Sequence, residues 1–289
     1  MERIKLAIEK AKASRADLLS SDRQSSHRQS SHQGDAGMSV AYDSREKDED
    51  TPDDLGAVQY AQTAVVSLDP AHLERHRVVA HQKAHPASWA FDVLRTQVLQ
   101  RMDESGWRTL AITSPSVESG KTVVAINLAI SIAQQTNRTA LLVDFDLRRP
   151  SVARSLGLNR PKSLNDFLDG HTNLAEALVN PGLERFVVLP TNQPVSGASE
   201  LLSSAKVGKL IKDLRERYSD RIVIFDLPPV LAADDVMSVL PRVDCVLMVV
   251  GSGVSTQTEV EEAMTRLSKA NLMGIVLNKD ESPTQNAYY

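Results

Sequence analysis

Residues 109–133 read TLAITSPSVESGKTVVAINLAISIA, an apolar run followed by a short polar loop and a second apolar segment. The run at 109–114 predicts a buried strand, and the segment 121–135 predicts a helix. The loop between them brings backbone N–H groups and a helix N-terminus together, which is an arrangement that binds phosphate. The stretch therefore predicts a nucleotide site at the end of a strand.

The loop departs from the usual phosphate-binding pattern G-x-x-x-x-G-K-[ST]. It keeps Gly120, Lys121 and Thr122 but has Pro115 in place of the first glycine. In such a loop the lysine reaches the β- and γ-phosphates of ATP, and the threonine hydroxyl binds Mg²⁺. We expect nucleotide contacts from eight consecutive residues: Ser116, Val117, Glu118, Ser119, Gly120, Lys121, Thr122 and Val123.

Two further apolar runs end in aspartate. One ends in Asp144 and Asp146, and the other carries Asp226 before two prolines. Alternation along the strand end places Asp144 and Asp146 on the same side. Carboxylates at the rim of a phosphate site are suited to hold Mg²⁺ or to accept the proton of a hydroxyl. The alternative is that the first pair only caps a helix that begins near Pro150.

The rest of the chain alternates short apolar runs with helical segments. Runs rich in Val, Ile and Leu without alternation predict strands buried on both faces. Their order predicts an α/β fold with a doubly wound, mainly parallel sheet, in which ligands bind at the carboxyl ends of the strands. The predicted strands are 109–114, 140–146, 186–191, 222–229, 245–252 and 273–279, and the predicted helices are about 86–102, 121–135, 150–157, 199–218 and 256–270.

Composition limits the possible classes of protein. The 289 residues carry a net charge of -4 and are 42% hydrophobic, which fits one medium α/β domain with extra segments and gives no reason to expect nucleic-acid binding. The single cysteine, Cys245, excludes a disulfide framework and fits a reducing, cytoplasmic compartment. No run of eighteen apolar residues occurs, so we expect no transmembrane segment.

The motifs resemble those of the bacterial tyrosine kinases (BY-kinases) of polysaccharide export, cytoplasmic type, within the deviant-Walker P-loop ATPases. That family combines a P-loop with an apolar-D-x-D-x-R motif and an apolar-D-x-P-P motif, which here are Gly120-Lys121-Thr122, Asp144-x-Asp146-x-Arg148 and Asp226-x-Pro228-Pro229. The last two motifs separate the kinases from their partitioning relatives. The resemblance covers about residues 65 to 279.

The resemblance implies catalytic roles for the residues at the motif positions. Lys121 would neutralise the charge that builds on the transferred phosphoryl group. Thr122, Asp226 and Asp144 would hold Mg²⁺ and its waters, and Asp146 or Asp144 would orient or deprotonate a tyrosine hydroxyl. Phosphoryl transfer depends mainly on such positioning and on electrostatic stabilisation.

The resemblance also implies contacts outside these motifs. Arg148 would brace the acidic pair or contact a neighbouring subunit, and Asn278 would contact the adenine. The phosphoacceptor in this family is a C-terminal tyrosine cluster that is phosphorylated in trans within a ring. Tyr288 and Tyr289 are the residues that match it here.

Three features, two single residues and one helix motif, depart from the pattern of the relatives. Glu118 replaces a glycine that lets the backbone approach phosphate closely, and it adds a negative charge. Ser116 stands where partitioning ATPases carry a signature lysine. An E-x-x-R-x-x-R helix joins the ring in the family, whereas Trp89, Asp92 and Arg95 occupy those positions here. A ring would then need other contacts, and Trp89 is either one of them or part of the core.

We divide the chain into four parts. Residues 1–19 have a basic helical pattern, which indicates either a frayed surface helix or a docking helix for a protein or an anionic membrane. Residues 20–64 predict a disordered linker. The P-loop ATPase or kinase domain is predicted at 65–280, and a flexible tail with the two tyrosines at 281–289.

We therefore expect an ATP- and Mg²⁺-dependent protein-tyrosine autokinase, with ATPase activity as the fallback, that regulates exopolysaccharide or capsule synthesis. Its expected partners are further copies of itself and a membrane chain-length-determinant (polysaccharide co-polymerase) protein, which would hold it peripherally at the inner membrane. Two alternatives stay open. Glu118 favours a regulatory nucleotide-binding ATPase with little or no kinase activity, and Ser116 argues against a partitioning-type positioning ATPase.

Overall fold

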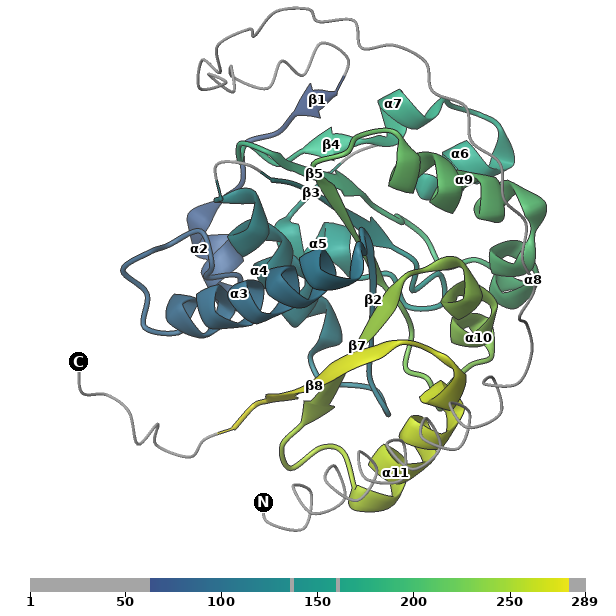
Figure 1. Cartoon of the computed structure of the whole chain (residues 1–289). Helices are drawn as coiled ribbons and strands as arrows, with labels where there is room; N and C mark the ends of the chain where they lie inside the picture. Colours follow the sequence, from purple (N-terminus) through teal and green to yellow (C-terminus); the bar gives the residue numbers. More distant parts are fainter. Residues whose placement is uncertain (1–62, 136–137, 160–161, 281–289) are drawn as a thin grey trace, which may run out of the picture. The chain divides into compact units, whose positions relative to one another are not determined.

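A computed structural model describes residues 63–280 except 136–137 and 160–161. The predicted parts 1–19 and 281–289, and nearly all of 20–64, lie outside the described residues, so these domain boundaries stay predictions. Within the described part, one eight-stranded sheet has the order β1-β4-β5-β3-β6-β2-β7-β8. Figure 1 shows helices on both faces of this sheet.

The predicted strands are present in the sheet. They are β2 (Thr109–Thr113), β3 (Thr139–Asp144), β5 (Phe186–Leu189), β6 (Arg221–Asp226), β7 (Cys245–Gly251) and β8 (Leu272–Asn278). Two short strands, β1 (Ala64–Val65) and β4 (Val179–Asn180), were not predicted. Each neighbouring pair in this sheet is parallel except β4 and β5. The doubly wound, mainly parallel α/β prediction is confirmed.

The strands are buried on both faces, as their uniform apolar composition predicts. Leu110 and Ile112 of β2 pack into one core, and Ala111 packs into the other. The first core is covered by α2 (Pro70–Arg75), α3 (Ser88–Ser105), α4 (Lys121–Ala133) and α5 (Val152–Leu156). The second is covered by α6 (Leu164–Asp169), α7 (Leu174–Ala177), α8 (Ala198–Ser203), α9 (Ala205–Glu216), α10 (Asp235–Val239) and α11 (Gln257–Arg266).

Some helices differ from the prediction. The predicted helix 199–218 is divided into α8 and α9 because Ser204 has an extended backbone and its side chain accepts the N–H of Val207 as an N-cap. The predicted helix 256–270 ends in the 3-10 turn Leu267–Lys269. The short helices α2, α6, α7 and α10, and the 3-10 turn Leu240–Arg242, were not predicted.

Trp89 lies on the outer face of α3. It is 62% exposed, so it is not part of the core. Arg95 donates to Asp92 at 2.7 Å and to the Ser131 hydroxyl at 3.1 Å, so both charged residues contact α4 within the same chain.

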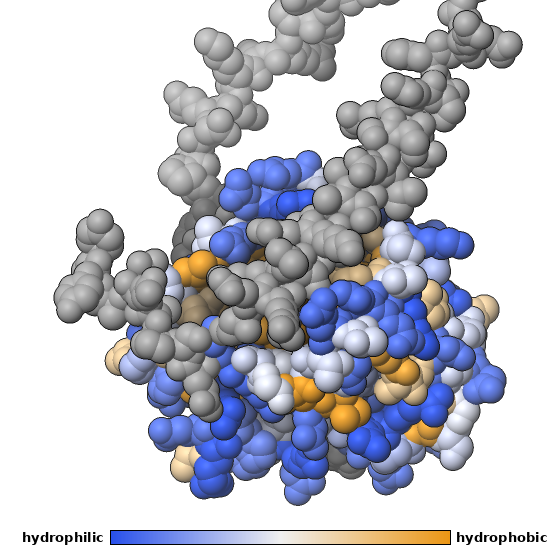
Figure 2. Space-filling model, turned by 90° about the horizontal axis from the view of Figure 1, so that it is seen from below, coloured by the Kyte–Doolittle hydropathy of each residue, from blue (hydrophilic) through white to orange (hydrophobic). Residues whose placement is uncertain are grey.

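The face of the molecule seen in Figure 2 is mainly hydrophilic, with apolar residues in small separate groups. None of the helices between residues 63 and 280 is long and apolar enough to cross a bilayer.

Candidate nucleotide site

The phosphate-binding loop lies between β2 and α4, at the carboxyl end of the central strands. Gly120 begins the helix with φ of 86°, in the left-handed region. A Cβ at this position would collide with the Asn278 side-chain amide, and that amide donates to the Ser119 carbonyl at 2.9 Å. Glycine is therefore required at position 120, and Asn278, which was predicted to contact adenine, braces the loop.

Serine hydroxyls hold the loop where glycines are missing. Ser114 and Ser119 both donate to the Ser116 carbonyl, at 2.8 and 3.1 Å. The Ser119 hydroxyl also lies 3.2 Å from that of Ser255, which follows β7. These contacts fix the loop against the sheet through side chains.

Glu118 takes the backbone conformation of the glycine that it replaces. Its φ is 63°, in the left-handed region that non-glycine residues rarely adopt. Its side chain is exposed and lines the pocket described below. The loop thus forms without the glycine, at the cost of backbone strain and with a negative charge near the phosphate position.

Lys121 joins the loop to the two aspartate motifs. Its Nζ lies 2.8 Å from Asp146 Oδ2 and 3.3 Å from Asp226 Oδ1, and its side chain is only 11% exposed. Burial by itself lowers the pKa of Lys121, but the Asp226 and Asp146 carboxylates outweigh burial and raise it. Lys121 therefore stays protonated and balances part of a buried negative charge.

Thr122 and Asp226 have the donor set that Mg²⁺ requires. The Thr122 hydroxyl donates to Asp226 Oδ2 at 2.6 Å, and the Ser151 hydroxyl donates to Thr122 Oγ1 at 3.0 Å. Burial raises the pKa of Asp226, against the opposing effect of Lys121 and Thr122. A hydroxyl and a buried carboxylate that lacks full compensation fit a hard divalent cation, which prefers oxygen ligands.

Asp144 is a helix cap as well as a neighbour of the site. Its carboxylate accepts the backbone N–H groups of Ser151 and Val152, at 3.1 and 3.0 Å, and that of Asp146 at 3.2 Å. It is fully buried, and burial together with the Asp226 charge raises its pKa well above the usual value. The capping alternative thus describes the hydrogen bonds of Asp144, and the Asp226 carboxylate lies close enough to raise the pKa of Asp144.

Arg148 does not contact the acidic pair. Its guanidinium is bound to Asp235 of α10, with Nε 2.7 Å from Oδ2 and Nη2 3.1 Å from Oδ1. Asp235 was not predicted as a site residue, because in the sequence it is only one of two adjacent aspartates before a short apolar stretch. A buried carboxylate 87 positions from its partner gives no local signal.

Several of these residues line one pocket with a volume of about 440 Å³, whereas Asp144, Asp226 and Asn278 are not among its lining residues. Its walls come from the phosphate-binding loop, from the segment after β3 and from the segment after β6. The lining residues are Val117, Glu118, Gly120, Lys121, Thr122, Val123, Asp146, Arg148, Arg149, Ser151, Arg154, Ser155, Pro228, Pro229, Ala232 and Ala233. The structure thus brings the three sequence motifs to a single cavity. Tyr288 and Tyr289 lie outside the described residues.

Comparison with known proteins agrees with this geometry. Residues 108–272, more than half of the chain, match the AAA domain family. The tyrosine-protein kinase Wzc of Salmonella typhi is 34% identical over 187 residues, which are 64% of this chain and 26% of Wzc. CapB of Staphylococcus aureus is 26% identical over 69% of this chain and 87% of its own length.

A solved structure extends the similarity to three dimensions. The kinase domain of the Escherichia coli tyrosine kinase ETK superposes with a TM-score of 0.66 at 28% identity, and the match covers 84% of this chain and all of that domain. The chain spans about a quarter of the length of Wzc. The similarity to Wzc and ETK therefore concerns a domain that carries the P-loop and both aspartate motifs.

Proposed function

The chain belongs to the AAA domain family and is homologous to the Wzc and Etk bacterial tyrosine kinases, and on that premise we propose that it is an ATP-dependent protein-tyrosine autokinase. The observation that carries the proposal is the position of Lys121 between Asp146 and Asp226. One residue from each motif meets there, at the place where a γ-phosphate and an acceptor hydroxyl would be brought together.

The contacts suggest what each residue does during transfer. When ATP enters, Lys121 exchanges part of its contact with the carboxylates for the phosphate oxygens, which need a cation more strongly. Asp146 is then free to accept the proton of a tyrosine hydroxyl as that oxygen bonds to the γ-phosphorus. The bond from this phosphorus to the β,γ-bridging oxygen breaks, and ADP is the leaving group. Backbone N–H groups of the loop and the start of α4 bind the remaining phosphates.

Mg²⁺ would be held by Thr122 and Asp226, with Asp144 as a further carboxylate beside Asp226 on the neighbouring strand. The bound ion would supply positive charge to the phosphate oxygens. The 2.6 Å contact between the Thr122 hydroxyl and Asp226 shows that these two side chains already converge. Asp226 accepts a hydrogen bond from the Thr122 hydroxyl, and this contact fixes the position of that oxygen.

We propose Tyr288 and Tyr289 as the phosphoacceptors, and Asn278 as a contact of both the loop and the nucleotide base. Both tyrosines follow the last strand by about ten residues of polar sequence. A segment of that kind can reach the site of a neighbouring copy in an oligomer. Trp89, exposed on α3, is an apolar side chain that such a contact could bury.

The relatives suggest a setting for this activity. We propose that the chain regulates exopolysaccharide or capsule chain synthesis and export, together with a membrane chain-length-determinant protein. It would then be cytoplasmic and peripheral at the inner membrane through that partner. The basic pattern at 1–19 is our candidate for the contact.

A phosphotyrosine immunoblot of the purified chain with Mg-ATP, alone and with the membrane partner, tests the proposal. We expect a signal that is lost when Tyr288 and Tyr289 are both replaced by Phe. The same double substitution should leave binding of Mg-ATP unchanged, because the described residues that line the pocket belong to the segments between 117 and 233. No signal under either condition would contradict the kinase proposal.

Glu118 supports a second candidate, a regulatory ATPase that binds nucleotide but transfers phosphate slowly or not at all. Its charge at the pocket and its strained backbone both disfavour tight phosphate binding. Measurable nucleotide affinity without turnover and without phosphotyrosine would favour this candidate. The positioning ATPase is less well supported, because Ser116 stands where those proteins carry a signature lysine.

A further inference from the structure

Three side chains from three segments meet beside the pocket. They are Arg148 from the loop after β3, Ser199 from the first turn of α8 and Asp235 from the first turn of α10. The guanidinium of Arg148 makes a two-pronged contact with Asp235, at 2.7 and 3.1 Å, and donates to the Ser199 hydroxyl at 3.3 Å. Ser199 also donates to Asp235. We name this set the Arg148 clamp.

The clamp is asymmetric in its exposure. The Asp235 side chain is completely buried, whereas that of Arg148 is 52% exposed and lines the pocket. Burial would raise the pKa of Asp235, but hydrogen bonds from Arg148 and Ser199 outweigh burial and lower it. Asp235 therefore remains charged, and Arg148 is held to it by a charge-assisted contact.

The clamp connects two walls of the pocket. Arg148 follows Asp146 by two residues, and the backbone around it is fixed by Asp146, which accepts the Arg149 N–H at 3.0 Å. On the other side, Asp235 begins the helix that follows the pocket residues Ala232 and Ala233. A change at Asp235 therefore affects the pocket wall that carries Asp146, because Arg148 joins the two.

We propose that Asp235 is a positioning residue for phosphoryl transfer, which holds Arg148 away from the nucleotide phosphates and fixes the loop that carries Asp146. The proposal rests on the proposed kinase function for its effect on turnover. Arg148 is then a restrained cation at the edge of the pocket, and its charge is already balanced by that of Asp235.

Loss of the Asp235 charge then has two opposite effects. The released guanidinium of Arg148 lies in a pocket that binds a triphosphate, so nucleotide binds more tightly. The loop that carries Asp146 loses its anchor, so the acceptor hydroxyl is oriented less well and turnover falls. A residue that only stabilised the fold would not strengthen nucleotide binding.

The test compares Asp235→Asn with wild type in the full chain. Calorimetry with Mg²⁺ and a non-hydrolysable ATP analogue should show affinity higher by about three- to tenfold, the net size of one added hydrogen bond. The kcat of phosphotyrosine formation should fall by roughly 10- to 100-fold, as expected for a misplaced catalytic group. Adding Arg148→Gln should return the affinity to the wild-type value without restoring kcat.

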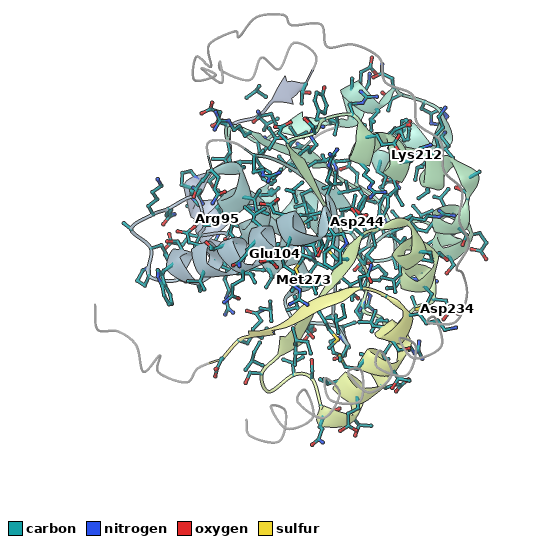
Figure 3. The ribbon with its side chains drawn as sticks, in the orientation of Figure 1. Arg95, Glu104, Lys212, Asp234, Asp244 and Met273 are labelled. Carbon is teal, nitrogen blue, oxygen red and sulfur yellow. The ribbon has the colours of Figure 1, made fainter. Side chains whose placement is uncertain are left out.

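A matched control exists at the other end of the sheet. Asp244 pairs with Arg215 at 2.7 Å and is only 11% exposed, but it precedes β7 and lies away from the pocket. Figure 3 labels Asp244. It also labels Asp234, which precedes the clamp residue Asp235 in the sequence. Asp244→Asn should lower the melting temperature and leave both the affinity for the analogue and kcat at the wild-type values.

The proposal is overturned if Asp235→Asn leaves the affinity unchanged or weakens it, or if Asp244→Asn reproduces the pattern. Should Asp235→Asn fail to fold, Arg148→Lys serves as the second variant, because it keeps both charges and removes the two-pronged contact. It should lower kcat, and an unchanged kcat would also overturn the proposal. If wild type forms no phosphotyrosine, the kinase proposal fails, while the affinity measurements still test the restraint on Arg148.

Discussion

Buried aspartates at the two ends of the sheet differ in how their charge is compensated. At the carboxyl end, Asp144, Asp146 and Asp226 share one lysine, and burial raises the pKa of Asp144 and of Asp226. At the amino end, Asp244 accepts from the Arg108 and Thr109 N–H groups and the Thr109 hydroxyl and pairs with Arg215. Uncompensated buried charge is costly, so its concentration at one end marks the functional site.

Replacing Lys121 with Met at the carboxyl end should have the largest effect, which is on the affinity for Mg-ATP. It removes the only lysine among the three carboxylates and the cation that binds phosphate, so affinity for Mg-ATP should fall by at least about 100-fold. Calorimetry measures this directly. Lys212, an exposed lysine on α9 that is labelled in Figure 3, supplies the control, and Lys212→Met should bind like wild type. Unchanged affinity in Lys121→Met would contradict the assigned site.

Asp244→Asn should reveal the stability that the amino end contributes. The substitution weakens a pair with the half-exposed Arg215 and removes one charged acceptor, at a cost of about 1–3 kcal/mol of unfolding free energy. Denaturant or thermal unfolding measures it. Because the change is remote from the pocket, nucleotide affinity should not follow the loss of stability.

Asp144, at the carboxyl end, should make the stability of the protein depend on pH. A raised folded-state pKa means that Asp144 favours folding fully below the ordinary aspartate pKa, and that this contribution is lost as pH rises through the raised value. The slope for one carboxyl cannot exceed about 1.4 kcal/mol per pH unit. Asp144→Asn should flatten the decline in unfolding free energy above about pH 4. An identical slope in the variant would show that another group is responsible.

Glu118→Gly, at the carboxyl end, should raise the unfolding free energy and the nucleotide affinity by smaller amounts. Glycine relieves the left-handed backbone, which should add about 0.5–1 kcal/mol to the unfolding free energy. Loss of the charge should also strengthen nucleotide binding by about two- to fivefold at low salt. Glu118→Gln separates the effects, since it removes the charge and keeps the strain. If Gly and Gln raise affinity equally without a stability difference, the backbone argument is wrong.

The fold could be predicted because its signals are local. The apolar runs at β2, β3, β6 and β7 are continuous, and each motif follows the end of its strand. The division between α8 and α9 depends on a single serine cap, which the helical pattern on both sides conceals. Short helices such as α10 contain five residues and give almost no periodic signal.

The site could be predicted as a set of positions but not as a set of contacts. The missing glycine at Glu118 identified the backbone position that the structure places at positive φ. By contrast, Arg148 and Asp235 are distant in sequence, and only the fold brings them together. The cap that Asp144 provides could be stated as an alternative, because Pro150 indicates a helix start, but its burial depends on tertiary packing.

The hydrogen bond from Asn278 to the Ser119 carbonyl ties the end of the last strand to the phosphate-binding loop. The chain from residue 278 to residue 288 spans at most roughly 33–36 Å. Under the function proposed above, Tyr288 would be an acceptor tethered close to the nucleotide site of its own chain, with a local concentration on the order of millimolar wherever the span permits. Transfer between copies would have to exceed this intramolecular supply, so the degree of assembly would determine which tyrosine a site encounters first.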